Sequence, residues 1–199
     1  MNNWNERYLS GDTPWEKGTA APPLLELLER MGSGIWGTDG VLVPGCGTGH
    51  DVRVLSGEGL EVLGVDLAEE AVARARSHPA VGNETYTPGD FLDPEWRAGK
   101  RFSAIWEHTC YCAIDPSRRP DYAEACAELI VPGGHLAGVF FLTPNEPGGE
   151  HEGPPFNASI GELDERFAPW FGRIDSWVPE RVHPGREGQE WLAIYRRKP

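Results

Sequence analysis

A short apolar segment that runs directly into alternating glycines constrains the fold more than any other feature. Residues 41–43 read Val-Leu-Val, as expected of a buried strand. Three glycines follow at every second position, Gly45, Gly47 and Gly49, and a helix is expected from about Asp51. Glycines here let the backbone pass close to a bound molecule, because no Cβ stands in the way. Ligands of open α/β sheets bind at the carboxyl ends of strands, so this segment predicts such a sheet with a ligand beside the loop.

Strand-like and helix-like segments alternate along most of the chain. Strands are expected at 41–43, 60–65, 84–87, 102–106 and 135–142, and helices at 22–31, from about 51, at 69–77 and at 122–130. The last of these helices should end at the Pro-Gly-Gly of residues 132–134. A helix near 160–168 then precedes two strand-like segments, 173–178 and 190–195, with no helix between them. We therefore predict an α/β, Rossmann-like fold, with helices on both faces of a mostly parallel seven-stranded sheet that ends in an antiparallel hairpin.

Length and composition narrow the class of protein. The 199 residues fit one domain, residues 1–199, in which residues 1–20 form an N-terminal arm. No apolar run approaches the ~18 residues that cross a membrane, and the first residues carry no secretory pattern, so we expect a cytoplasmic protein without a membrane partner. The net charge of −13 argues against a nucleic-acid partner, because binding phosphates needs a basic surface. We expect a monomer, with a dimer as the alternative.

The four cysteines, at positions 46, 110, 112 and 126, form neither a CxxC pair nor a zinc-like spacing. We therefore predict free thiols and no metal site. Cys110 and Cys112 alternate, so a strand through them would place both sulfur atoms on one face.

Acidic residues follow the second and third predicted strands. Asp66 ends the second strand, 17 residues after Gly49, where a carboxylate can accept hydrogen bonds from both hydroxyls of a ribose. Asp90 and Phe91 follow a Pro-Gly turn after the third strand, where the carboxylate can accept from an adenine amino group beside the ring. A turn cap is the alternative role for Asp90. The glycine spacing is not that of dinucleotide enzymes, and no P-loop lysine is present, which favours a ligand without pyrophosphate.

The chain resembles the thiopurine S-methyltransferase family, and within it the branch of halide and thiol methyltransferases. The matching segments are Trp4 with Tyr8 and Trp15, Thr13-Pro14-Trp15-Glu16, Val43-Pro-Gly-Cys-Gly-Thr-Gly-His-Asp51, Val65-Asp66-Leu67, Cys112-Ala-Ile-Asp-Pro116 and Gly153-Pro-Pro-Phe156. They occur in the order of the family and spread over most of the chain. The resemblance implies a class I methyltransferase that uses S-adenosylmethionine and releases S-adenosylhomocysteine.

The resemblance also implies roles for individual residues. N-terminal aromatic side chains close over the cofactor in that family, and a sulfonium cation is stabilised over an aromatic face. Pinning the arm to the core is the alternative role for these rings. Tyr8 stands where the family has tryptophan, which preserves the ring. The cofactor-binding residues are then expected to be Trp4, Tyr8, Trp15, Gly45, Gly47, Asp66, Leu67, Asp90, Phe91 and Glu107.

The expected reaction is methyl transfer to a small soft nucleophile, namely a thiol, a thiopurine, a halide, thiocyanate or another chalcogen anion. A soft anion needs no base, and a small thiol is already partly ionised near neutral pH. His108 and Tyr111 are expected to line the acceptor pocket, with His108 as an optional base. Phe156, in a Gly- and Pro-rich loop at 143–159, is expected to cap the acceptor. The alternatives are O- or N-methylation of a small metabolite, or a protein that binds the nucleotide without chemistry.

Overall fold

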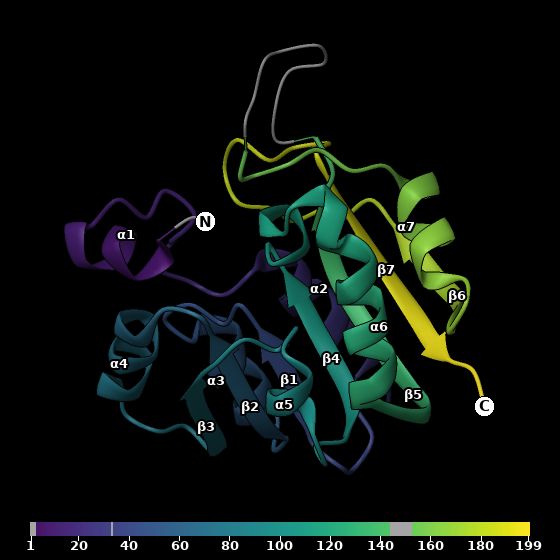
Figure 1. Ribbon diagram of the computed structural model, residues 1–199, viewed down its shortest axis with the longest axis horizontal. Helices are drawn as coiled ribbons and strands as arrows, with labels where there is room; N and C mark the ends of the chain where they lie inside the picture. The colour runs from purple at the N-terminus through teal and green to yellow at the C-terminus, as the bar shows by residue number, and fades with distance from the viewer. Residues whose placement is uncertain (1–2, 33, 144–152) are drawn as a thin grey trace.

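The structure is a computed structural model that describes residues 3–32, 34–143 and 153–199 (Figure 1). Its strands form one sheet in the order β3-β2-β1-β4-β5-β7-β6. The strands are β1 (Val41–Pro44), β2 (Glu61–Asp66), β3 (Asn83–Pro88), β4 (Phe102–His108), β5 (Ile130–Phe141), β6 (Phe171–Trp177) and β7 (Glu190–Arg197). Strands β1 to β5 pair in parallel, whereas β7 pairs antiparallel with both β5 and β6. The predicted fold class, including the antiparallel edge, is confirmed.

The helices cover both faces of this sheet. They are α1 (Trp4–Ser10), α2 (Pro22–Met31), α3 (His50–Gly57), α4 (Glu69–Ser77), α5 (Pro94–Arg97), α6 (Arg119–Leu129) and α7 (Ile160–Phe167), with 3-10 turns η1 (Tyr111–Ala113) and η2 (Pro116–Arg118). Helices α6 and α7 lie in front of the sheet and α2 and α3 behind it (Figure 1). Because side chains alternate along a strand, Leu42 packs in the front core while Val41 and Val43 pack in the rear one.

Strand β5 begins earlier than the sequence predicts. The helix predicted at 122–130 is observed as α6 and ends at Leu129, within one residue of the prediction, but the strand predicted from 135 starts at Ile130, which already pairs with Phe102 of β4. The next registered pair on β5 is His135 with Ala104. The Pro-Gly-Gly segment therefore lies in a bulge, where a strand accommodates residues that cannot continue its hydrogen-bonded ladder.

Cys110 and Cys112 do not lie in a strand. Strand β4 ends at His108, and residues 111–113 form a 3-10 turn. The turn is stabilised by the buried carboxylate of Glu107, whose Oε1 accepts the backbone N–H groups of Cys110 (3.0 Å) and Tyr111 (2.9 Å). All four cysteines are free thiols, as predicted, and three of them are buried.

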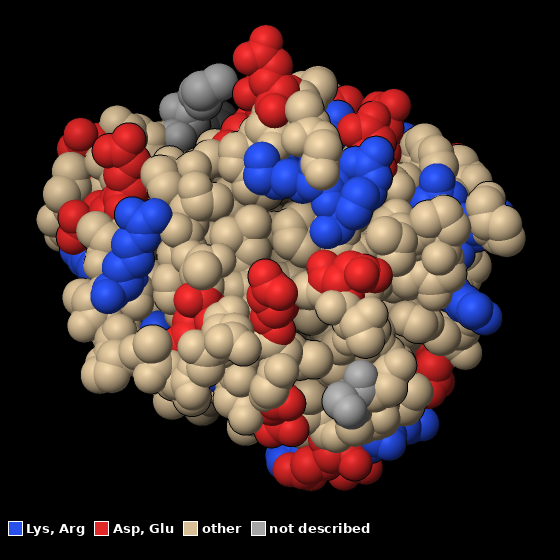
Figure 2. All heavy atoms as spheres, turned by 90° about the horizontal axis from the view of Figure 1, so that it is seen from below, with Lys and Arg blue, Asp and Glu red and all other residues tan. Residues whose placement is uncertain are grey.

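One face of the molecule carries charged side chains of both signs (Figure 2). The face that Figure 2 shows carries acidic and basic side chains in separate small groups between large uncharged areas, with no continuous basic patch. Among the described residues, no helix has the length and apolar character needed to cross a bilayer.

The close contact between β4 and β5 provides a test of this packing. A Cβ on Gly138 of β5 would lie 2.5 Å from the Cβ of Glu107 and 3.1 Å from its carbonyl oxygen. We expect Gly138→Ala to lower the free energy of unfolding by about 1–3 kcal/mol, as overpacking does, and to lower Tm in thermal unfolding. Gly172→Ala is the matched control, because this strand glycine has no atom within 4 Å of the added Cβ. Equal Tm changes in the two variants would contradict the packing described here.

Candidate functional site

A cavity of about 450 Å³ opens at the carboxyl ends of β1, β2 and β4. It lies where the strand order reverses, since β2 is on one side of β1 and β4 on the other. This is the position at which open α/β sheets bind ligands, and the volume is within the ~300–1,000 Å³ usual for small-molecule sites. Of the predicted site residues, those in its lining are Trp4, Tyr8, Trp15, Gly45, Gly47, Asp66, Leu67, Asp90, Phe91 and His108.

The glycine loop after β1 forms the floor of the cavity. Gly45 and Gly47 have φ values of 61° and 53°, which residues with a side chain rarely adopt. A Cβ on Gly47 would lie 3.0 Å from the Tyr8 hydroxyl, and one on Gly45 would lie 3.1 Å from the sulfur of Cys110. Tyr8 and Cys110 thus pack directly against the loop and leave no room for a side chain at either glycine.

Asp66 stands at the end of β2, beside this loop. Its Oδ2 accepts the backbone N–H of Gly47 at 2.9 Å, and its Oδ1 accepts that of Ala68 at 2.9 Å. Burial raises the pKa of the Asp66 carboxyl, and these two N–H groups offset part of that effect. Each carboxylate oxygen keeps a further lone pair, so the side chain is fixed in place and can still accept from a ligand hydroxyl. The next residue, Leu67, also lines the cavity and is 54% exposed.

Asp90 and Phe91 line the cavity wall next to Asp66. Oδ1 of Asp90 accepts the backbone N–H of Leu92 at 2.8 Å, which is the turn-capping role considered above as an alternative. The capping role does not remove the residue from the site, since it remains in the lining. The ring of Phe91 packs edge-on against Tyr122, with the ring centroids 5.3 Å apart.

The aromatic residues of the arm form one cluster over the cavity. The ring of Trp15 lies 5.3 Å from that of Trp4 and 5.8 Å from that of Tyr8, in edge-to-face arrangements. Its indole N–H donates to the Tyr8 hydroxyl at 3.0 Å. Tyr8 is buried, whereas Trp4 and Trp15 are partly exposed. The cluster therefore packs against the core, as the pinning role predicts, and also lines the cavity. Contact of these rings with the cofactor stays a prediction.

Glu16 attaches the arm to the glycine loop and to α3. Its carboxylate accepts from the Thr48 hydroxyl at 2.6 Å and lies 3.0 Å from Nε2 of His50. The hydrogen bond with His50 makes the largest contribution to lowering the pKa of Glu16, from 4.5 to about 2. The arm is thus held by an ionised side chain.

His108 lies at the other end of the cavity, at the end of β4, and is held by Asp51 of α3. Nδ1 of His108 is 3.0 Å from Oδ2 of Asp51. The same carboxylate accepts the backbone N–H of Ala21 at 2.7 Å and the indole N–H of Trp106 at 2.7 Å. Burial alone would raise the pKa of Asp51, but the neighbouring His108 and these donors together lower it below its ordinary value.

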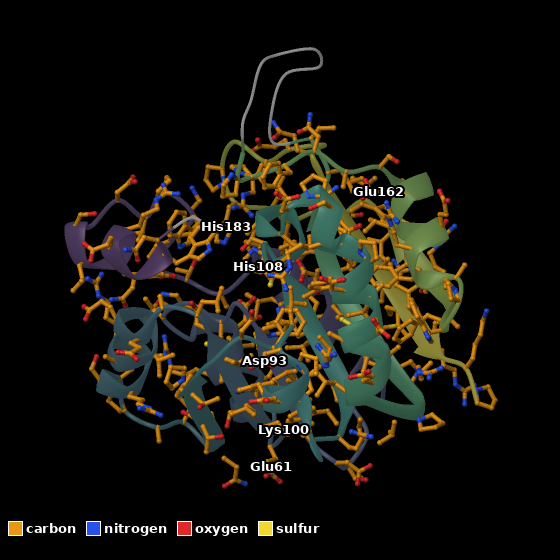
Figure 3. All side chains as sticks on the ribbon, in the orientation of Figure 1. Glu61, Asp93, Lys100, His108, Glu162 and His183 are labelled. Atoms are coloured by element: carbon orange, nitrogen blue, oxygen red, sulfur yellow. The ribbon has the colours of Figure 1, made fainter. Side chains whose placement is uncertain are left out.

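Two residues near His108 were missed in the sequence. His183 stacks against His108, with ring centroids 6.2 Å apart and planes at 21°, and both are labelled in Figure 3. Nη1 of Arg186 lies 3.4 Å from Nε2 of His108 and 2.8 Å from Oε1 of Glu190. Burial, followed by the charges of His108 and Arg186, lowers the pKa of His183 to about 4. Their place in the chain was the one available signal. Because β7 runs antiparallel to β5, the connection from β6 to β7 must lie at the carboxyl edge of the parallel strands, where the cavity is.

Glu107 does not line the cavity, contrary to its prediction as a cofactor-binding residue. Side chains alternate along β4, so Glu107 lies on the face opposite His108. There it is 1% exposed and accepts hydrogen bonds from the turn after β4 and from the Tyr122 hydroxyl.

Tyr111 and Phe156 are not in the lining either. The Tyr111 ring packs in the front core, and its hydroxyl donates to Glu162 at 3.0 Å, so the prediction that it lines the acceptor pocket is wrong. Phe156 donates its backbone N–H to the carbonyl of Cys112 at 2.7 Å, while Pro154 and Pro155 are the residues of that loop that line the cavity. The predicted cover at 143–159 lies partly outside the described residues, which resume at residue 153.

Comparisons with known proteins agree with the family resemblance found in the sequence. The family model of thiopurine S-methyltransferase matches residues 1–176. The chain is 30% identical over 199 residues to the probable thiol methyltransferase 2 of Arabidopsis thaliana, covering 98% of this chain and 84% of that protein. It is 31% identical over 170 residues to the thiocyanate methyltransferase 1 of Brassica oleracea, covering 83% of this chain and 71% of that protein.

Solved structures show the same fold at lower sequence identity. The CcbJ methyltransferase of Streptomyces caelestis superposes with a TM-score of 0.73 at 17% identity, covering 98% of this chain and 96% of that one. The family match over most of the chain and the identity to curated relatives lead to one conclusion: the chain belongs to the thiopurine S-methyltransferase family and is a class I methyltransferase that uses S-adenosylmethionine.

Proposed function

We propose that this enzyme methylates a small soft nucleophile, a thiol or a related anion, bound beside His108. The observation that carries the proposal is the continuity of the cavity. One space joins the glycine loop and Asp66 at one end to His108, His183 and Arg186 at the other. A donor and an acceptor placed at the two ends would meet in it with water excluded, which is how proximity supplies much of the rate of a displacement.

The residues of the cofactor end suit S-adenosylmethionine. This compound supplies an electrophilic methyl group on a sulfonium and leaves as S-adenosylhomocysteine. In the proposed arrangement, Asp66 accepts from the ribose hydroxyls, and Asp90 with Phe91 meets the adenine. The part of the cavity lined by Gly45 and Gly47 would take the chain of the ligand. The aromatic cluster of the arm would face the positive sulfur, a contact that contributes about 0.5–2 kcal/mol.

The other end suits an anionic or ionisable acceptor. Two imidazoles and a guanidinium face it, and such donors stabilise a thiolate or thiocyanate better than they stabilise a neutral alcohol or amine. The names of the relatives at 30% and 31% identity refer to thiol and thiocyanate acceptors, which supports the same class. Oxygen or nitrogen acceptors would need stronger activation, and the described residues contain no group of three or more His, Cys, Asp or Glu that could hold a metal ion.

Replacing Asp66 should weaken cofactor binding. We expect Asp66→Ala to raise the Kd for S-adenosylhomocysteine more than about tenfold, because hydrogen bonds to a charged group contribute ~1.5–3 kcal/mol each. The Kd is measured by titration calorimetry. The matched control is Asp93→Ala, since Asp93 also accepts the N–H two residues later at 2.9 Å but lies outside the cavity lining (Figure 3). Unchanged affinity in Asp66→Ala, or an equal loss in the control, would remove the ribose assignment.

Replacing Glu16 should loosen the arm. We expect Glu16→Gln to weaken S-adenosylhomocysteine binding roughly fivefold, because a partly exposed charged contact contributes only ~1 kcal/mol. Glu6→Gln makes the same change of charge at an exposed position of the arm and should leave the Kd unchanged.

The pH dependence of arm docking follows from the same group. Because the pKa of Glu16 falls from 4.5 to about 2 on folding, its contribution is complete above pH 4.5 and is lost as the pH falls toward 2. Tryptophan fluorescence should report this loss in the wild type and not in Glu16→Gln. Identical fluorescence titrations would contradict the docking role.

An acceptor panel tests the proposed chemistry directly. With labelled S-adenosylmethionine, we expect methylation of thiophenol, hydrosulfide, thiocyanate or iodide, and at most weak methylation of phenol and aniline, which match thiophenol in shape. The reason is that the soft anion is available near neutral pH without a strong base. Methylation of phenol or aniline at the rate of thiophenol would overturn the proposal.

A further inference from the structure

We propose that Asp51 and His108 form a proton-accepting pair that ionises thiol acceptors at Nε2 of His108, with the unpartnered Nε2 of His183 contacting the same sulfur. This inference rests on the proposed function and adds that acceptors fall into two classes, according to whether a proton must be removed before methylation. Neutral thiols would need the pair, whereas anions such as thiocyanate would not.

The hydrogen bonds of Asp51 determine which nitrogen of His108 carries the proton. The backbone N–H of Ala21 and the indole N–H of Trp106 can only donate, so both carboxylate oxygens of Asp51 already act as acceptors. The lowered pKa of Asp51 agrees with an ionised carboxylate. Nδ1 of His108, 3.0 Å away, is therefore the protonated nitrogen. Nε2 is left as an acceptor, with Nη1 of Arg186 at the long distance of 3.4 Å, and a thiol would have to displace this contact to reach it. A carboxylate that holds one imidazole tautomer is the arrangement of hydrolytic triads.

The charges around His108 balance once the proton has moved. Asp51 approaches from α3, while Arg186 and His183 approach from the connection between β6 and β7. Arg186 is buried and ion-paired with Glu190, and the lowered pKa keeps His183 neutral near pH 7. Two charges lie farther away. Glu107, on the opposite face of β4, interacts with His108, and Lys17 of the arm interacts with His183. Protonated His108 would then pair with Asp51, and the new thiolate would lie beside Arg186.

His183 provides an independent indication that a ligand binds here. The residue is 5% exposed, lines the cavity and has a buried Nε2 with no hydrogen-bond partner among the described residues. A buried polar atom without a partner is rare in folded proteins, because desolvating it is costly. A ligand atom at the edge of the His183 ring, in the ring plane at Nε2, would provide that partner.

The proposed step balances in atoms and electrons. The S–H bond breaks, its proton forms a bond to Nε2 of His108, and the electron pair stays on sulfur. That pair forms the new bond to the methyl carbon while the bond from this carbon to the sulfonium breaks, and its electrons remain on the departing sulfur. His108 then releases its proton to water. Asp51 acts through His108, so it is a positioning residue.

The test compares two acceptors in one variant. For His108→Gln we expect kcat/KM with ethanethiol to fall by about 10²-fold or more near pH 7, the usual contribution of a general base. We expect kcat/KM with thiocyanate to change little, since this acceptor has no proton to remove. The thiol profile of the wild type should show an acid limb that thiocyanate lacks. In His108→Gln that limb should give way to a rise that follows the free thiol's own ionisation, which for a simple alkanethiol lies in the alkaline range.

Two further measurements keep the proposal open to refutation. His78→Gln alters an exposed histidine outside the cavity lining and should reproduce both wild-type profiles. Nitrogen-15 NMR of the imidazoles reads the tautomer without any reaction. It should show Nδ1 of His108 protonated in the wild type and a changed tautomer in Asp51→Asn. The Tm of Asp51→Asn checks that this variant is folded.

The outcomes separate this inference from the proposed function. If the wild type methylates both acceptors and His108→Gln loses them equally, His108 is only a pocket contact and the inference is overturned. Protonation at Nε2 in the wild type would overturn it too. If the wild type methylates neither acceptor, the proposed function fails, and the inference that rests on it fails as well.

Discussion

One buried carboxylate, that of Asp51, joins the parts on which the site depends. It accepts hydrogen bonds from the residue that precedes α2, from the indole of Trp106 in β4 and from the imidazole of His108. A buried charge is costly unless donors surround it, and here the donors come from segments far apart in the sequence. The carboxylate that holds these segments together therefore also orients His108.

The cofactor end is built differently, because backbone groups rather than distant side chains fix it. Two N–H groups within the neighbouring loops hold Asp66, and the glycine loop is shaped by the close approach of Tyr8. Glu16 holds the arm next to the glycine loop through Thr48 and His50. In the proposed arrangement, enclosure of the cofactor and docking of the arm are therefore linked through the same contacts.

Sequence reasoning was most successful where the signal was local. The alternation of strands and helices, the glycine loop and the acidic residue that ends β2 all follow from periodicity and spacing. It was less successful where the outcome depended on tertiary contacts. The sequence does not say which residues of β4 point toward the cavity, so Glu107 was assigned to the wrong face of the sheet. Tyr111 packs in the aromatic core instead of lining the cavity. His183 and Arg186 escaped notice because the pairing of β7 with β5, which the sequence does not reveal, brings their connection to the site.

That connection has a consequence for how such enzymes diverge. The glycine loop and Asp66, Asp90 and Phe91 lie in the first half of the chain, whereas His183 and Arg186 follow residue 176, where the match to the family model ends. In the proposed arrangement, mutations between β6 and β7 can therefore alter which nucleophile is accepted while the first half of the chain continues to bind the methyl donor. New acceptor preferences can arise in this fold by changing a surface segment of about a dozen residues.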